Sequence, residues 1–118
     1  MRYLVTLKSG PMDAPPPQAL MDAILALGAE ATASGALLDT AGLAPSAMGG
    51  ARVALADGEI TVTDGPFAET KEMISYALYQ VRDRAEAVEW AARFLRLHRD
   101  LWPDWEGEAD VLSVFTAP

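Results

Sequence analysis

The hydrophobic positions of this chain follow two spacings, one typical of strands and one typical of helices. Short runs that alternate in polarity, or that are rich in β-branched and aromatic residues, predict strands. These runs are residues 3–7, 36–43, 52–55, 60–63, 74–81 and 109–115. Apolar residues at helical spacing predict one helix through residues 20–31 and a second over residues 85–99. The predicted order is therefore β-α-β, a hairpin, and β-α-β again.

Local signals support several of these boundaries. Prolines 15–17 are expected in the first turn of the first helix, where their missing N–H groups cost nothing, and Gly35 is expected to end that helix in a left-handed conformation. The pair Asp57 and Gly58 between two alternating runs is a strong hairpin signal. Asp83, three residues before Glu86, predicts a capped start for the second helix.

Two βαβ halves in 118 residues predict a single domain, residues 1–118, of the α+β class. The expected architecture is a ferredoxin-like βαβ-βαβ sandwich, in which a four-stranded antiparallel sheet carries both helices on one face and the hairpin is an insertion. The other face of such a sheet has no cover. We therefore expect two copies to pack their sheets face to face as a homodimer.

Composition and charge narrow the classes of partner and cofactor. The chain carries 17 acidic and nine basic residues, a formal charge of −8 that opposes phosphate backbones and anionic lipids, so we expect no nucleic-acid and no membrane partner. The N-terminal residues lack a signal-peptide pattern, and no apolar run approaches about 18 residues, which favours a cytoplasmic location. The chain has no cysteine, one histidine and no glycine-rich phosphate loop, so we expect no metal and no cofactor.

The stretch DGPFAETKE, residues 64–72, interrupts the apolar pattern before the fifth strand. Gly65 permits unusual backbone conformations, Pro66 fixes φ, and Phe67 is expected to plug the turn into the core. Asp64 has two interpretations. It can accept hydrogen bonds from backbone N–H groups one or two residues on, or it can serve as a general base if burial raises its pKa.

The polar end of the stretch also has two interpretations. Glu69, Thr70 and Lys71 bring two charges and a hydroxyl to the place where the hairpin returns to the sheet. If they face a chamber above the sheet, they could bind a substrate carboxylate and move a proton. If they face outward, they form a solvated loop edge.

His98 is the only side chain whose ordinary pKa lies near neutral pH, which makes it a candidate general base. It also falls in the last turn of the second helix, where a group that binds free carbonyls is favoured. This helix carries a broad apolar arc, and we expect the arc to pack on the sheet and on the loop that contains Trp102 and Trp105.

The DGPFAETKE stretch and several flanking segments resemble the YCII-related, or DGPF-motif, family. The flanking matches are MRYLVTLKSG at the N-terminus, residues 35–38, residues 43–45 and residues 97–108. The resemblance implies a ferredoxin-like domain that dimerises by sheet packing, as in the dimeric α/β-barrel superfamily. Some branches are proposed to use a histidine–aspartate pair, some relatives dehalogenate, and DGPF proteins are often associated with extracytoplasmic-function sigma factors. Residues 1–30 contain no counterpart of that histidine.

These observations favour a small dimeric protein that binds a small organic molecule between its sheet and the DGPF loop. Whether it also performs cofactor-independent acid–base chemistry, of a lyase, isomerase or dehalogenation type, is open. Candidate catalytic residues are Asp64, Glu69 and His98, and candidate ligand-binding residues are Asp64, Phe67, Glu69, Thr70 and Lys71. The alternative is a non-catalytic regulatory or accessory module that contacts a protein of the transcription machinery.

Overall fold

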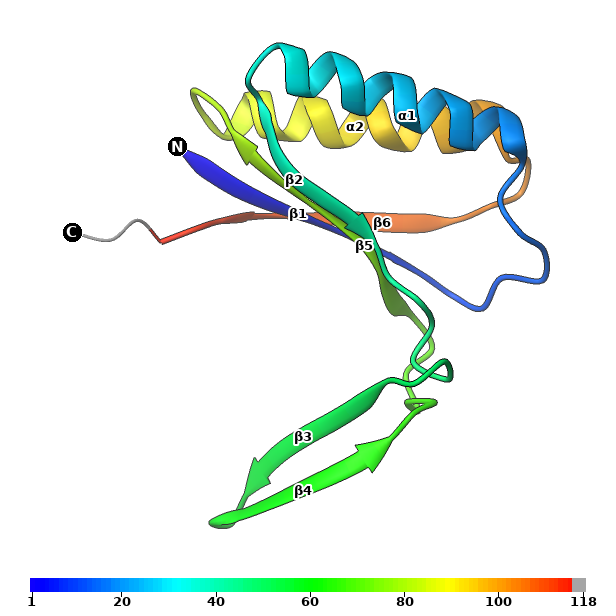
Figure 1. The fold of residues 1–118 in the computed structure, drawn as a ribbon, viewed down its shortest axis with the longest axis vertical. Helices are drawn as coiled ribbons and strands as arrows, with labels where there is room; N and C mark the ends of the chain where they lie inside the picture. The colour runs from blue at the N-terminus through cyan, green and yellow to red at the C-terminus, as the bar shows by residue number, and fades with distance from the viewer. Residues whose placement is uncertain (116–118) are drawn as a thin grey trace.

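The computed structural model describes residues 1–115 and contains two helices and six strands (Figure 1). In chain order they are β1 (Arg2–Ser9), α1 (Gln18–Ala33), β2 (Leu37–Gly42), β3 (Ala51–Ala56), β4 (Glu59–Asp64), β5 (Glu72–Gln80), α2 (Arg84–Leu101) and β6 (Gly107–Ser113). The predicted order of elements is confirmed. The last strand lies two residues earlier than predicted.

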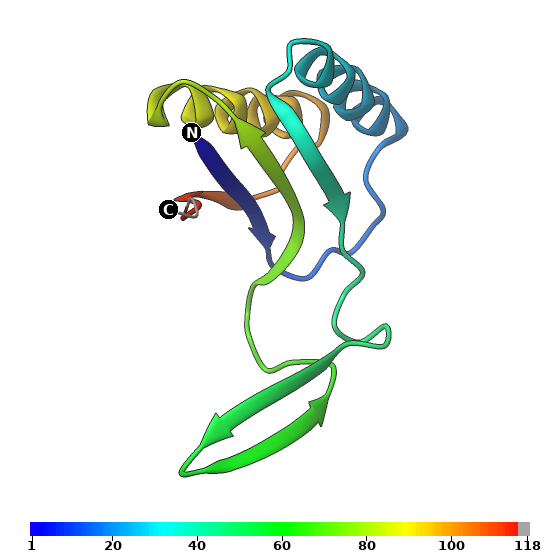
Figure 2. The same cartoon turned by 60° about the vertical axis from the view of Figure 1, so that its left-hand side comes forward.

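A four-stranded antiparallel sheet in the order β2-β5-β1-β6 forms the body, and β3 and β4 form a separate two-stranded sheet. Both helices cover the same face of the larger sheet (Figures 1 and 2). This arrangement confirms the α+β, ferredoxin-like prediction, with the hairpin as an insertion between β2 and β5.

The side chains of β1 point alternately to the two faces of the sheet. Tyr3, Val5 and Leu7 are buried on the face that the helices cover. Their core neighbours include four alanines and one tyrosine: Ala31 of α1, Ala36 just before β2, Ala87 and Ala91 of α2, and Tyr79 of β5. The even positions lie on the opposite face, and we call that surface the open face. Leu4 pairs there with Leu78 on one side and with Leu112 on the other.

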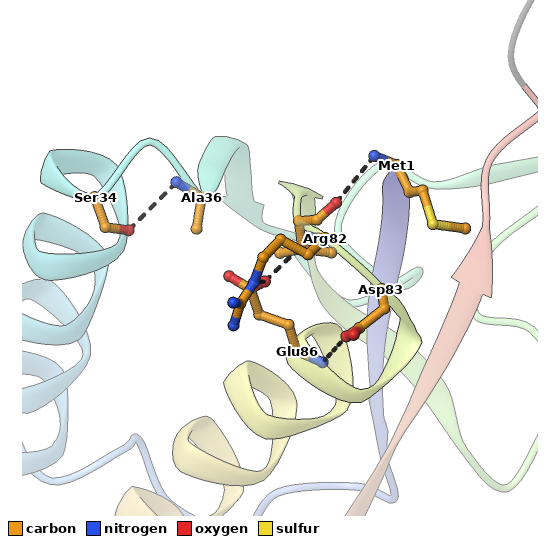
Figure 3. Close-up of polar contacts among 7 residues, drawn as sticks. Met1, Ser34, Ala36, Arg82, Asp83 and Glu86 are labelled. Atoms are coloured by element: carbon orange, nitrogen blue, oxygen red, sulfur yellow. Dashed lines mark hydrogen bonds and ion pairs between the residues drawn. The ribbon is translucent and has the colours of Figure 1, made fainter.

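The helix ends follow the local signals with one exception. Asp83 caps α2 by accepting a hydrogen bond from the Glu86 backbone N–H at 2.9 Å, and the Glu86 carboxylate accepts one from the Arg82 N–H (Figure 3). Gly35 has φ +83°, the left-handed conformation that was predicted. The placement of all three prolines in the first turn of α1 is wrong. Pro17 is the N-cap, and Pro15 and Pro16 lie before the helix because a residue that precedes a proline is disfavoured in the helical region.

The hairpin of β3 and β4, residues 51–64, extends away from the body, and we call it the arm (Figure 2). Its turn places Asp57 at φ 52° and Gly58 at φ 77°, the two positive φ values of a type I′ turn. Every residue of both strands is exposed. The radius of gyration is 16.0 Å, whereas a compact chain of this length would have about 13–14 Å. The arm accounts for this difference.

Candidate functional site

Ser46 holds the base of the arm together. Its side chain is buried, with 9% of the residue exposed, although it lies in the connection between β2 and β3. Its Oγ donates a hydrogen bond to the Glu72 carboxylate, and its backbone N–H donates a second one at 3.2 Å. The same Oγ accepts a hydrogen bond from the Phe67 N–H at 3.0 Å. One hydroxyl therefore links the connection that enters the arm, the DGPF motif and the start of β5.

Two glycines let the connections approach each other closely. A Cβ added to Gly65 would lie 1.9 Å from the Ser46 carbonyl oxygen, and one added to Gly50 would lie 2.7 Å from it. The Gly50 N–H donates to that oxygen, and the Gly65 N–H donates to the Gly50 oxygen, both at 2.9 Å. The Gly65–Pro66 peptide is cis. Glycine is required here because backbone atoms occupy the space of a side chain.

Asp64 does not form the expected local turn in the described part of the chain. It is the last residue of β4, it is exposed, and it pairs with Ala51 in the hairpin. The Gly65 N–H, one residue on, donates instead to the Gly50 oxygen, and Pro66 has no N–H to donate. The preceding connection, through the Gly50 carbonyl oxygen and Ser46 Oγ, thus binds the N–H groups of Gly65 and Phe67.

Phe67 does not enter the core as expected. Its ring is half-buried at the base of the arm, with the Arg52 guanidinium over it at 4.2 Å from the ring centre. The core lies on the helix-covered face of the sheet, and the motif lies beyond the end of β4, so the side chain stacks against the arm instead.

A cleft of about 520 Å³ lies between the base of the arm and the end of the sheet, and we call it the DGPF cleft. Its polar and aromatic lining comes from β1, the connection between β2 and β3, the start of β3, the motif and the start of β5. These side chains are Lys8, Ser46, Arg52, Phe67, Glu69, Lys71 and Glu72. Two of the acids and three cations of this strongly acidic chain therefore gather around one hollow.

Each cation of the DGPF cleft has an acidic partner. Arg52 pairs with Glu69, Lys71 Nζ lies 3.4 Å from Glu108, and Lys8 Nζ lies 3.7 Å from Asp110. The hydrogen bond from Arg52 is the main cause that lowers the pKa of Glu69, so this carboxyl is ionised at neutral pH. These side chains are 41–55% exposed, and ion pairs at exposed positions are screened by solvent and contribute little stability. The pairs can therefore exchange partners at low cost.

Thr70 faces a second cleft, of about 550 Å³, on the other side of Lys71. This cleft is bounded by residues 10–14 after β1 and by residues 102–108 at the end of α2 and the start of β6. The indole N–H of Trp105 is buried beside it without a hydrogen-bond partner among residues 1–115. Lys71 lines both clefts and stands between them.

His98 lies in a different layer of the molecule. It is 4% exposed and lines an apolar cavity of about 480 Å³ between the helices and the sheet. Its Nδ1–H donates a hydrogen bond of 2.9 Å to the Phe94 carbonyl oxygen. Its ring packs against Phe94 and Trp105. Burial lowers the pKa of His98, so the ring is neutral at pH 7 with Nε2 as its free acceptor.

The structure thus brings together three of the predicted site residues and separates the rest. Phe67, Glu69 and Lys71 line the DGPF cleft, Thr70 lines its neighbour, and His98 and Asp64 lie elsewhere. No sequence pattern pointed to Ser46, Arg52 and Lys8, which also line the cleft. Ser46 had the signature of an ordinary turn, and no local pattern connects the two cations to a motif that is distant in the sequence. Among residues 1–115, no group of three histidine or acidic side chains is placed to hold a metal ion.

The fold and the motif define the class of protein. A family model, the YCII-related domain, matches residues 1–101, and the chain therefore belongs to the YCII-related family. The match includes the whole DGPF motif and ends before β6, which supplies the acidic partners of Lys8 and Lys71. No curated protein matches the chain. Within the described residues, neither helix combines the length and the apolar character that crossing a membrane requires.

Proposed function

We propose that this protein binds a small organic anion in the DGPF cleft. The observation that supports the proposal is the gathering of Lys8, Arg52 and Lys71, three of only nine basic residues, around one hollow in a chain of charge −8. A volume of about 520 Å³ suits a small organic acid, since ligand sites commonly span about 300–1,000 Å³.

The ion pairs of the cleft indicate how such a ligand would be held. A ligand carboxylate would replace Glu69 on Arg52 or Glu108 on Lys71, and the exposed pairs that it breaks are weak. The guanidinium of Arg52 can bind a carboxylate through two parallel hydrogen bonds, and it is already held in position by the Phe67 ring. The ligand's apolar part would lie along Leu43 and Met73.

The geometry supports binding more strongly than turnover. Glu69 is the only catalytic candidate that lines the DGPF cleft, and Arg52 keeps it ionised with a lowered pKa. Acid–base chemistry has one route here. A ligand that takes Arg52 away from Glu69 would remove the main cause of that lowered pKa, and the freed carboxylate could then accept a proton.

We also propose that the protein is a homodimer that packs sheet against sheet. The open face carries the row Leu78, Leu4 and Leu112, and Leu112 is 53% exposed. Burying such a surface favours association. Sedimentation at micromolar concentration tests the proposal, and a monomer of 12.6 kDa would contradict it.

The test of the ligand proposal is a thermal-shift screen of aromatic and hydroxy carboxylic acids, with neutral phenols as a second panel. An acid at a hundred times its Kd stabilises the fold by about 2.7 kcal/mol, which raises Tm by roughly 10 °C for a domain of this size. Arg52→Gln should abolish that shift. Arg99→Gln, which removes an exposed cation of α2 outside the cleft, should preserve it.

Two results would contradict the ligand proposal. One is the absence of a shift with every acid, and the other is an equal shift in wild type and Arg52→Gln. A shift with neutral phenols that His98→Phe abolishes and Arg52→Gln preserves would move the ligand to the apolar cavity beside His98.

The alternative function is a non-catalytic accessory module that contacts the transcription machinery. One observation favours it, the exposed apolar surface of the arm. A module of this kind needs no anion in the DGPF cleft, so Arg52→Gln would leave its function unchanged. Substitutions on the arm would abolish that function.

A further inference from the structure

One face of the arm is entirely aliphatic at its centre, and neither strand of the arm packs extensively on another helix or strand among residues 1–115. Val53 lies opposite Val62 and Leu55 lies opposite Ile60, so these four side chains share a face. They are 67–72% exposed. The other face of the same hairpin carries Ala54 opposite Thr61, a small and polar pair.

An isolated two-stranded hairpin is marginally stable in water and needs a further layer against its apolar face. The arm nevertheless has a well-formed turn and a base that is tied to the body through Ser46. The four aliphatic side chains are therefore presented in a defined direction and lack a packing partner among residues 1–115.

We propose that the apolar face of the arm docks on the body of a second copy of this chain, against that copy's open face. The inference rests on the proposed dimer and adds to it a second contact, made by exchange of arms. The arm and the helices lie on opposite sides of the sheet (Figures 1 and 2), so the arm extends on the side where a partner's sheet would arrive.

The area of the two contacts favours a second copy as the occupant. Full burial of an aliphatic side chain contributes about 1.5–3 kcal/mol. At about 25 cal/mol per Å², this corresponds to about 60–120 Å² of buried surface per side chain. Four such side chains, about 70% exposed, offer about 250 Å² per arm. Two arms, together with the equal area that they cover on the two bodies, would bury about 1,000 Å² in total. This is just below the roughly 1,200–2,000 Å² that specific interfaces bury. Arm docking and sheet packing together meet that requirement.

Two-fold exchange also accounts for both unpartnered surfaces at once. Each copy has one arm and one open face with the row Leu78, Leu4 and Leu112. A symmetric dimer covers two of each, and the arriving body would close the DGPF cleft, which is partly lined by Lys8 and Met73 at the end of the open face. The proposed anion site would then be enclosed only in the dimer.

The test compares Leu55→Ser/Ile60→Ser with the matched control Ala54→Ser/Thr61→Ser on the opposite face of the arm. Sedimentation over a concentration series should give a dimer Kd for the first variant that is at least about a hundredfold weaker, because the dimer loses four buried side chains. The control should stay within about threefold of wild type. Unchanged circular dichroism in both variants shows that the body is folded.

The outcomes separate the two proposals. A wild-type dimer that Leu55→Ser/Ile60→Ser leaves equally tight overturns arm docking and keeps sheet packing. A wild-type monomer overturns both, whereas a shift with carboxylic acids would still support the anion site. If the arm variant does not fold, hydrogen exchange of β3 and β4 in the wild type decides. Protection must rise as the protein is concentrated through its dimer Kd, and protection that is independent of concentration overturns the inference.

Discussion

Ser46→Ala should destabilise the protein, because the Ser46 hydroxyl links three segments at the base of the arm. The substitution removes a donor to the Glu72 carboxylate and the acceptor of the Phe67 N–H. A hydrogen bond to a charged group contributes about 1.5–3 kcal/mol, and an unpaired N–H costs about 1–3 kcal/mol when buried. Glu72 and Phe67 are only half-buried, so water can replace part of the loss. We expect a net cost of about 2–3 kcal/mol.

Urea unfolding followed by circular dichroism measures this cost. With a slope of about 1–3 kcal/mol/M, the midpoint should fall by about 1–2 M while the slope stays unchanged. Ser113→Ala, at an exposed position of β6, is the control and should lie within about 0.5 kcal/mol of wild type. Because the arm base could open on its own, hydrogen exchange at Phe67 is measured as well. A change below about 0.5 kcal/mol in both measurements would refute the assigned role of Ser46.

Two further predictions concern backbone approach and pH. Gly65→Ala places a Cβ 1.9 Å from the Ser46 oxygen and should cost about 1–3 kcal/mol in chemical unfolding. Gly28→Ala, in α1 with no atom within 4 Å of the new Cβ, should instead stabilise the protein by about 0.5–1 kcal/mol. If both substitutions lowered the stability by equal amounts, the steric argument would be contradicted. Burial lowers the folded-state pKa of His98, so as pH falls below its ordinary value of 6.5 the unfolded chain takes up the proton first and stability declines. His98→Gln should reduce the pH dependence of the free energy of unfolding between about pH 7 and 5. An unchanged pH dependence would show that other groups cause it.

The elements of the fold were predictable because their signals are local. The alternation in β1, the Asp83 cap, the left-handed Gly35 and the Asp57–Gly58 turn all depend on residues within a few positions of one another. The prediction failed for the first turn of α1, where three successive prolines restrict one another.

The candidate site was less predictable because its parts meet only in the folded chain. Glu69 and Lys71 are close in sequence to Phe67, and the motif identified them. Arg52 reaches Glu69 across the arm, and Lys8 reaches the cleft from the first strand. His98 shows the converse. Its chemistry suggested a base, and its position buries it among aromatic rings away from the motif.

The sequence by itself determined the class of fold and the family, because helix and strand periods and a nine-residue motif are written in consecutive residues. Only the tertiary structure decided that Gly65 must be a glycine, because Ser46 backbone atoms fill the space of a side chain there, and which charges surround the cleft. Ser46 and Glu72 are 26 residues apart, and no pattern in the chain links them before it folds. Hydrogen bonds and ion pairs act over a few ångströms in space, and folding alone brings distant residues within that range.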